Sequence, residues 1–264
     1  MDSCTYKFYY ADGFDSRQYL ESYLSDKSEM VFGDNSLKFP IENLAKIFAD
    51  GHIKGDVLID LSIGPLAHQL FAACEFFKQI IVLKIRDEWQ LKCIMELKRW
   101  VEDCAGAFYW GHAAKLQVDL EGKGDKFEDR EEKVRSALHY IKKCDLTKEN
   151  IMNPVVLPPV DCIISAWFLD VISKDHDDYM RYLGKFLKLL KPGGHIILIG
   201  DLDTTFLKVG NDKIHVLNYD EDFVRKALVG EGFIIDCCEV KKRTDVSDYS
   251  DCKAVIFIAA HKVK

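Results

Sequence analysis

The stretch "VLIDLSIGPLAHQL", residues 57–70, predicts a β-strand, a tight turn and the start of a helix. Its first five residues are apolar except for one aspartate, a pattern typical of a strand buried in a parallel sheet. Pro65 suits the first position of a helix, where a missing N–H leaves no hydrogen bond unmade. We therefore predict a strand over 57–61 and a helix from Pro65 to about Phe77, the opening unit of an α/β fold.

The same alternation of short apolar runs with helical patterns extends along the chain. A helical pattern over 37–48 precedes the opening unit, and in the charged segment after it Val134, Leu138 and Ile141 repeat at helical spacing. We expect, in chain order, a strand over 79–83, a helix over 88–101, a strand over 114–120, a charged helix over 122–143, a strand over 160–168, a helix over 175–190 and a strand over 195–200. This order predicts a mostly parallel sheet with helices on both faces.

The last third of the chain departs from this alternation. Residues 206–218 predict a hairpin around Gly210, and a helix follows over 220–229. The final strands, 232–240 and 252–261, are separated by a polar loop that is too short for a helical crossover. We therefore expect them to pair antiparallel.

Composition excludes several classes of protein. The chain has 264 residues, of which 48% are hydrophobic, and we expect one domain. A net charge of −7 and a pI of about 5.6 leave no basic excess for nucleic acid or an anionic membrane surface. No apolar run approaches the ~18 residues that span a bilayer, and the N-terminus lacks the pattern of a signal peptide. We expect no nucleic-acid or membrane partner, and a monomer.

The cysteines indicate a reducing compartment. There are nine, an odd number, with no CxxC pair and no histidine at metal-ligand spacing. We expect reduced thiols that pack as small hydrophobic side chains in a cytoplasmic protein, and no metal site.

Candidate site residues follow from the fold class. In an open α/β sheet, ligands bind beyond the carboxyl ends of the strands. That rule selects the turn at 61–65, the end of the second strand near Lys84, the end of the strand over 160–168, and Asp201.

Several motifs together resemble one family over nearly the whole chain. They are "FDSRQYLESY" (14–23), "GDVLIDLSIGP" (55–65), "CDLTK" (144–148), "LPPVDCIIS" (157–165) and "LLKPGGHIIL" (189–198). The chain resembles the nicotinamide, phenylethanolamine and indolethylamine N-methyltransferases, which are class I S-adenosylmethionine-dependent enzymes. The spacing of "LPPVDC" and "LLKPGG" is far more specific than a lone glycine motif.

The resemblance implies a Rossmann-like, seven-stranded, mostly parallel sheet with an antiparallel last strand. It also implies that residues 1–50 form a helical lid over a core of 51–264. The cofactor would be S-adenosylmethionine and the substrate a small amine or heteroaromatic molecule. Methyl transfer from a sulfonium works mainly by aligning the reacting atoms, so little acid–base help is expected.

The family pattern also assigns roles to individual residues. Tyr19 would lie over the methionyl end of the cofactor, Asp145 would accept from the adenine amino group, and Leu146 would give a backbone contact. Asp201 would hold the substrate amine or amide, with Thr204 nearby.

The turn after the first strand departs from the family pattern. Relatives carry Gly-Ser-Gly before the proline, whereas this chain has Ser62, Ile63 and Gly64. Glycine lets a ligand approach the main chain, while a β-carbon at 62 and a branched side chain at 63 do not. We expect a poorer cofactor cradle.

The second strand departs from the pattern as well. The family ends it with an acidic residue that accepts both ribose hydroxyls, and Lys84 stands at that position. Lysine has three donors and no acceptor, and Asp87 lies too far along the chain to be assumed a substitute. The loss of such charge-assisted bonds, about 1.5–3 kcal/mol, would weaken binding roughly tenfold to a hundredfold.

Three smaller departures surround the same ligand. Leu24 stands where a second cofactor-facing tyrosine is expected, with Tyr23 one place early. His68 replaces a tyrosine, and Trp89 replaces a polar residue near the adenine.

Two hypotheses remain open from the sequence. The first is a working small-molecule N-methyltransferase with an adjusted cofactor site, in which Trp89 stacks on the adenine and Lys84 reaches a substrate carboxylate or phosphate. The second is a catalytically degenerate member that no longer binds S-adenosylmethionine and serves a binding, regulatory or structural role. For most of these residues an ordinary structural role is equally open: Asp145 and Asp201 as turn carboxylates, Lys84 as a solvated charge.

Two other classes of enzyme find less support. A dinucleotide-dependent dehydrogenase needs G-x-G-x-x-G after the first strand and an acidic residue ending the second, and both are missing. Nucleophilic catalysis by a cysteine has no spacing signal in this chain.

Overall fold

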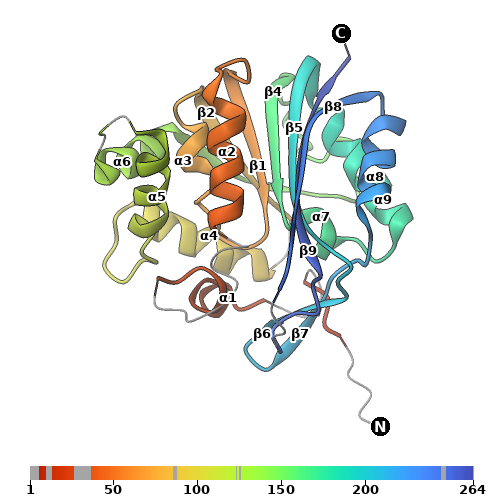
Figure 1. The fold of residues 1–264 in the computed structure, drawn as a ribbon, viewed down its shortest axis with the longest axis horizontal. Coiled ribbons are helices and arrows are strands. Elements are labelled where there is room, and N and C mark those ends of the chain that lie inside the picture. The colour runs from red at the N-terminus through yellow and green to blue at the C-terminus, as the bar shows by residue number, and fades with distance from the viewer. Residues whose placement is uncertain are drawn as a thin grey trace.

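One seven-stranded sheet organises the chain. The computed structural model describes residues 6–9, 14–26, 37–85, 88–122, 124, 126–244 and 248–263, without the side chains of 88–90 and 139. Within these residues the sheet has the order β3-β2-β1-β4-β5-β9-β8 (Figure 1). Its strands are β1 (Gly55–Ser62), β2 (Phe77–Ile85), β3 (Leu138–Cys144), β4 (Val160–Ala166), β5 (Leu190–Leu202), β8 (Phe233–Lys242) and β9 (Ala254–Lys262).

The strand directions confirm the predicted sheet. β1 pairs parallel with both β2 and β4, and Ile59 lies opposite Ile81 on one side and Ile163 on the other. β9 runs antiparallel to β5 and to β8, as the short loop before it predicts. The strand order reverses beside β1, so β1 and β4 flank the crevice in which α/β proteins bind ligands.

Helices cover both faces of the sheet. In Figure 1 α2, α3, α5 and α6 lie to the left of it and α7, α8 and α9 to the right. The helices are α1 (Ser16–Tyr23), α2 (Phe39–Ala49), α3 (Leu70–Ala73), α4 (Glu88–Val101), α5 (Gly111–Glu121), α6 (Phe127–Ala137), α7 (Phe168–Ile172), α8 (His176–Leu187) and α9 (Glu221–Gly230). Aspartate side chains cap α1, α8 and α9 by accepting from a backbone N–H three residues on.

The helix predicted from Pro65 is wrong in its extent. Residues 65–69 form turns, and regular helix is confined to α3, four residues long. Gln69 explains the delay: its amide donates to Asp60 and Ser62, which holds the chain against β1 before a helix can begin.

The segment between α4 and β4 is also assigned wrongly by the sequence pattern. Residues 114–120, predicted as a strand, lie in α5, which ends at Gly122 with a φ of +64°. Residues 138–143, predicted as the end of a long helix, form β3 instead. β3 is an edge strand, where charged residues keep one side in water, so its lysines imitate the polar face of a helix.

A two-stranded hairpin closes one end of the molecule. β6 (Phe206–Val209) and β7 (Asp212–His215) pair antiparallel around Gly210, as predicted. Figure 1 shows this hairpin at the same end as α1, and the Tyr23 hydroxyl donates to the carbonyl of Lys208 at 2.7 Å. The N-terminal helix is thereby tied to the hairpin beside the carboxyl ends of the parallel strands.

Two further sequence expectations concern thiols and membranes. All eight cysteines among the described residues are free, and Cys4 lies outside them. No helix in the described ranges combines the length and hydropathy that crossing a bilayer takes.

Candidate functional site

The first turn, residues 62–65, follows β1 at the centre of the sheet. Gly64 has a φ of +57°, whereas Ser62 and Ile63 are not among the described residues with positive φ. The glycine that the turn needs is therefore retained, and Ser62 and Ile63 cause no backbone strain. Both of them are completely buried, so their side chains fill the space beside the turn.

Lys84 closes this turn from the neighbouring strand. It is the penultimate residue of β2 and has no exposed surface. Its ammonium donates to the carbonyl oxygens of Ser62 at 2.7 Å and of Gly64 at 2.6 Å. The solvated lysine that a strand end ordinarily carries is not what the structure shows.

A buried polar network holds the turn from below. The Asp60 carboxylate accepts from the Ser62 hydroxyl at 2.7 Å and from the Gln69 amide at 2.8 Å. Burial raises the pKa of Asp60, and the charge of Lys84 opposes that rise. Burial lowers the pKa of Lys84, and the charge of Asp60 opposes that fall. Each side chain therefore supports the charged form of the other.

Aromatic side chains of the N-terminal segment cover the other side of the turn. The Gly64 N–H donates to the Tyr9 hydroxyl at 3.0 Å. A β-carbon at Gly64 would lie 3.3 Å from the Phe14 ring and 3.5 Å from the Tyr19 ring. Tyr19 thus lies beside the first turn, its expected contact with the methionyl end of the cofactor stays a prediction, and Leu24 is buried.

The residues expected at the adenine end lie beyond β3. Asp145 accepts from the backbone N–H and the hydroxyl of Thr147, at 3.0 and 2.6 Å. The Leu146 carbonyl accepts from the Lys185 ammonium at 2.6 Å. Asp145 therefore shapes a local turn, and its proposed role toward adenine stays a prediction. The side chain of Trp89 and the whole of Asp87 lie outside the described parts.

Asp201 lies near the end of β5, among aromatic rings. Its carboxylate accepts from the indole N–H of Trp167 at 2.8 Å. Trp167 has a φ of +51°, a costly conformation for a bulky residue, and it aims the indole at Asp201. Burial raises the pKa of Asp201 to about 6. Burial also raises the pKa values of Tyr19 and Tyr23, and the charge of Asp201 adds to both, so these hydroxyls share its surroundings.

Asp170, which sequence reasoning missed, lies behind Asp201. It belongs to α7, is buried, and accepts from the Asp201 backbone N–H at 3.1 Å. Burial, and secondarily the charge of Asp201, raise the pKa of Asp170 to about 7. In the sequence, the only indication that Asp170 is unusual is its place as a lone carboxylate in the apolar run "AWFLDVI" (166–172).

His68 is a buried histidine with unsatisfied nitrogens. Neither ring nitrogen has a hydrogen-bond partner among the described residues, and burial lowers its pKa to about 3. Its ring centroid lies 5.9 Å from that of Trp110 and 6.2 Å from that of Trp167. An orphaned buried polar group of this kind commonly marks a place where a ligand or a water supplies the missing partner.

Thr204 is engaged in a structural network. Its hydroxyl donates to the Asp251 carboxylate at 2.9 Å, and Asp251 also accepts from the hydroxyl of Thr205 at 2.6 Å. Thr204 is completely buried. This bond holds the segment after β5, and the expected place of Thr204 beside the substrate stays a prediction.

The residues at the first turn do not fit S-adenosylmethionine in the binding mode that the resemblance implies. Ribose hydroxyls need acceptor oxygens at the end of β2, and Lys84 has only donors. The carbonyls of Ser62 and Gly64 already accept from Lys84. The N–H groups of Ile63 and Gly64 already donate to Ala166 and Tyr9. The protein itself uses the groups that a bound cofactor would use.

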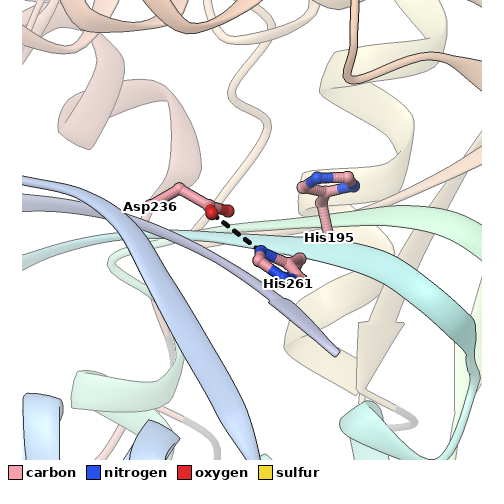
Figure 2. A group of neighbouring side chains, drawn as sticks. All are labelled: His195, Asp236 and His261. Carbon is pink, nitrogen blue, oxygen red and sulfur yellow. Dashed lines mark hydrogen bonds and ion pairs between the residues drawn. The ribbon is translucent and has the colours of Figure 1, made fainter. Parts of the chain in front are cut away.

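A second cluster lies on three strands away from the first turn. His195 of β5 is directly paired with His261 of β9. The carboxylate of Asp236 in β8 accepts a hydrogen bond from His261 Nδ1 at 2.7 Å (Figure 2). The register between β8 and β9 shifts at Asp236, so the extra residue of a bulge carries the carboxylate. One ligand atom from each of the three side chains lies within 4.8 Å of the others.

Comparison with known families gives a match over almost the entire chain. The model of the NNMT/PNMT/TEMT family matches residues 3–263. Human nicotinamide N-methyltransferase is 34% identical over 259 residues, which are 98% of this chain and 97% of the relative. Rabbit (Oryctolagus cuniculus) indolethylamine N-methyltransferase is 32% identical over 96% of this chain and 95% of its own. Human phenylethanolamine N-methyltransferase is 30% identical over 95% of this chain and 89% of its own.

Solved structures support the fold alone. Magnesium protoporphyrin IX methyltransferase from Synechocystis, with bound SAM, has a TM-score of 0.53 at 13% identity, covering 93% of this chain and 90% of its own. The N-methyltransferase NodS from Bradyrhizobium japonicum, with S-adenosylhomocysteine, has a TM-score of 0.51 at 12% identity, covering 95% of this chain and 100% of its own. The sheet and its covering helices are those of a class I methyltransferase.

Proposed function

This chain belongs to the NNMT/PNMT/TEMT family, and we propose on that basis that it transfers a methyl group from S-adenosylmethionine to a nitrogen of a small amine or pyridine-type substrate. The observation that carries the proposal is the half-enclosed carboxylate of Asp201 among aromatic rings. The relatives that support it are named for methylating nicotinamide, an indolethylamine and a phenylethanolamine.

The surroundings of Asp201 suit a cationic or amide-bearing ligand. A carboxylate attracts an ammonium or accepts from an amide N–H, and aromatic faces attract cations by about 0.5–2 kcal/mol. Trp167 and Tyr19 are aromatic residues beside Asp201, and the unsatisfied nitrogens of His68 offer one more polar contact. The site therefore combines apolar bulk with few oriented polar groups, which is typical of small-molecule sites.

The chain's own residues position the acceptor nitrogen. An amine must present a free lone pair, and an ionised Asp201, with a pKa of about 6, can accept the proton that the methylated amine gives up. A pyridine nitrogen gives up no proton, so for that class Asp201 would only orient the ring or its amide. Trp167 fixes the direction of the Asp201 carboxylate through its indole N–H.

A second candidate function is favoured by one specific observation. Lys84 and Tyr9 already use the polar backbone groups of the first turn. A family member whose turn is permanently closed in this way would retain the carboxylate of Asp201 as a binding group for a small amine without catalysis. This candidate predicts ligand binding and no methyl transfer.

Methyl transfer to a panel of amines and pyridines, followed by mass spectrometry at saturating S-adenosylmethionine, separates the two candidates. We expect at least one acceptor to be methylated by the wild-type chain. Asp201→Asn should lower kcat/KM roughly 30-fold to 1000-fold, equivalent to ~2–4 kcal/mol. Asp203→Asn is the matched control, because Asp203 is exposed and Asn tolerates its φ of +51°. Amine binding without methylation of any acceptor would favour the second candidate.

The remaining features of the proposal concern organisation. We place the lid in residues 1–50 over a core of 51–264, because the rings of Phe14 and Tyr19 lie against Gly64. A cytoplasmic monomer without a nucleic-acid partner is consistent with the free thiols and the net charge of −7. Size-exclusion chromatography with light scattering tests the monomer.

A further inference from the structure

We propose that Lys84 and S-adenosylmethionine compete for the first turn, so that the cofactor binds in its family mode only when the Lys84 ammonium leaves the carbonyls of Ser62 and Gly64. The inference concerns the cofactor end of the same site, and it rests on the proposed function in taking S-adenosylmethionine as the ligand. It goes beyond that function by assigning an internal competitor to the site.

The hydrogen bonds of Lys84 fix its ammonium at one position in the turn, so the side chain is not loosely packed. Two short bonds, 2.7 and 2.6 Å, join its ammonium to consecutive parts of one turn. The side chain has no exposed surface, so water does not replace these bonds. Charge-assisted bonds of this kind are stronger than neutral ones, and a ligand that breaks them must replace them.

Ser62 and Ile63, the other unusual residues of the turn, support this position of the Lys84 ammonium. The Ser62 hydroxyl donates to Asp60, and Asp60 provides the negative charge that Lys84 faces from β1. Ile63 is buried and occupies volume beside the turn. The space and the polar groups of the turn are therefore occupied together by Ser62, Ile63 and Lys84.

Charge also opposes joint occupancy by the lysine and the cofactor. S-adenosylmethionine carries a positive sulfonium, and a fixed ammonium in the same enclosed region repels it more strongly than it would in water. An acidic residue at 84 would instead attract the cofactor and accept from its ribose hydroxyls.

A binding experiment tests the competition. Calorimetric titration with S-adenosylhomocysteine compares the wild-type chain, the triple variant S62G/I63S/K84D and the control Lys78→Asp. Lys78 lies at the other end of β2 and is 81% exposed, so its substitution makes the same charge change away from the turn. We expect at least tenfold tighter binding by the triple variant and no change in the control. Equal affinity of the wild type and a folded triple variant would overturn the proposal.

A second measurement uses only the wild-type chain, so it does not depend on the folding of a variant. Reductive methylation with labelled formaldehyde, mapped by peptide mass spectrometry, should modify Lys78 while Lys84 stays protected. Saturating S-adenosylhomocysteine should make Lys84 reactive. If Lys84 reacts as fast as Lys78 in the free protein, or stays fully protected in the saturated complex, the competition does not exist.

Failure of the competition and failure of the proposed function give different results. Tighter binding by the triple variant without methylation of any acceptor would refute N-methyl transfer and leave the competition standing. Methyl transfer by a wild-type chain that binds the cofactor as tightly as the triple variant would do the reverse.

A different observation carries a second inference: we propose that His195, Asp236 and His261 bind a divalent transition metal such as Zn²⁺. Two imidazoles and a carboxylate are ligands that zinc accepts, and the trio offers them from three adjacent strands (Figure 2). The bulge at Asp236 directs the carboxylate toward His261. His52 places a third imidazole nearby, with ring centroids 5.9 Å from His195.

Metal binding would replace the proton between His261 and Asp236. Two ligands of one zinc ion lie at most about 4.2 Å apart, so side chains now within 4.8 Å must close slightly. His261 and Asp236 are partly exposed, at 32% and 23% of their side-chain surface, which leaves them free to rotate and leaves an entry path.

Cobalt(II) serves as the spectroscopic probe for this site. We expect one equivalent to bind with visible ligand-field bands and without the near-ultraviolet band of a cobalt thiolate, which excludes the free cysteines. His261→Gln should weaken binding at least tenfold, whereas His176→Gln, an exposed histidine at the start of α8, should not change it. Unchanged binding in His261→Gln, or a thiolate band, would overturn the proposal.

Discussion

The Nζ atom of Lys84 lies 2.6 Å from the carbonyl oxygen of Gly64, so a side chain of the second strand closes the turn that follows the first. The same turn receives Tyr9 from the N-terminal segment through the Gly64 N–H. Gly64 is thus hydrogen-bonded by the protein at both its carbonyl and its amide, so a ligand that accepts from the Gly64 N–H must displace Tyr9.

Gly64→Ala should destabilise the chain more than Gly122→Ala. Both glycines have positive φ, +57° and +64°, which costs an L-residue about 1–2 kcal/mol. A β-carbon at 64 would also press on the rings of Phe14 and Tyr19, while nothing lies within 4 Å at 122. Urea denaturation measures the difference, and equal losses in the two variants would show that the aromatic cover yields without cost.

Asp170→Asn should flatten the pH dependence of stability. The pKa of Asp170 is about 7 in the folded chain and ~3.9 in an unfolded one, so between these values the folded state binds more protons. Wild-type stability therefore falls by a few kcal/mol as pH rises from about 4 to about 7, relative to the variant. Unfolding titrations across this range, with Asp203→Asn as control, test the sign; a difference between wild type and variant that does not change with pH would contradict it.

His68→Phe should leave stability unchanged or raise it while weakening substrate binding. Two buried nitrogens without partners are removed, which relieves a desolvation cost of about 1–3 kcal/mol, and an aromatic ring still fills the space. The stability of the variant relative to the wild type should increase as pH falls below 6.5. The unfolded wild type binds a proton on His68 below that pH, whereas the folded state keeps His68 neutral down to a pKa of about 3. Thermal unfolding and KM are measured for the wild type and the variant. A large loss of stability in the variant would mean that the His68 nitrogens form stabilising hydrogen bonds, contrary to this expectation.

Asp201 predicts an acidic limb in the pH profile of methyl transfer. Its carboxyl is ionised above a pKa of about 6, and only the ionised form attracts an ammonium or accepts its proton. We expect kcat/KM to fall below pH 6 in the wild type and to lose that limb in Asp201→Asn. A limb that persists unchanged in the variant would assign it to another group, including Asp170.

Most of the sheet could be predicted from the sequence because its central strands are continuous apolar runs. β1, β2, β4 and β5 are such runs, and each is bounded by turns or charges. The prediction failed at α5 because this helix alternates apolar and polar residues as a strand does. It failed at β3 because an edge strand tolerates lysine and so resembles the polar face of a helix. Whether such a segment becomes a helix or a strand depends on the strand beside which it packs, and a local sequence pattern does not contain that information.

The site could be predicted in position but not in bonding. The strand-end rule for α/β sheets placed Lys84 and Asp201 at the carboxyl ends of two parallel strands, and the structure has them near the ends of β2 and β5. It did not show that Lys84 is buried, because a lysine in sequence carries no sign of its hydrogen-bond partners. Asp170 and the positive φ of Trp167 depend on tertiary packing in the same way.

The cluster of His195, Asp236 and His261 could not be predicted from the sequence, because its three residues share no regular spacing along the chain. His195, Asp236 and His261 come from three strands, and only the register of β5, β9 and β8 brings them together. The bulge that brings Asp236 to His261 has no signature in the sequence either.

The bonds of the N-terminal segment set an order of events during synthesis. Lys7 pairs with Asp212, 205 positions later, and its backbone bonds to Lys213 and His215 in the hairpin. Tyr9 lies two residues from Lys7, so the cover over Gly64 can settle only after the last third of the chain has left the ribosome. Until then the Gly64 N–H has no bond to Tyr9, so this part of the central turn is completed late in synthesis.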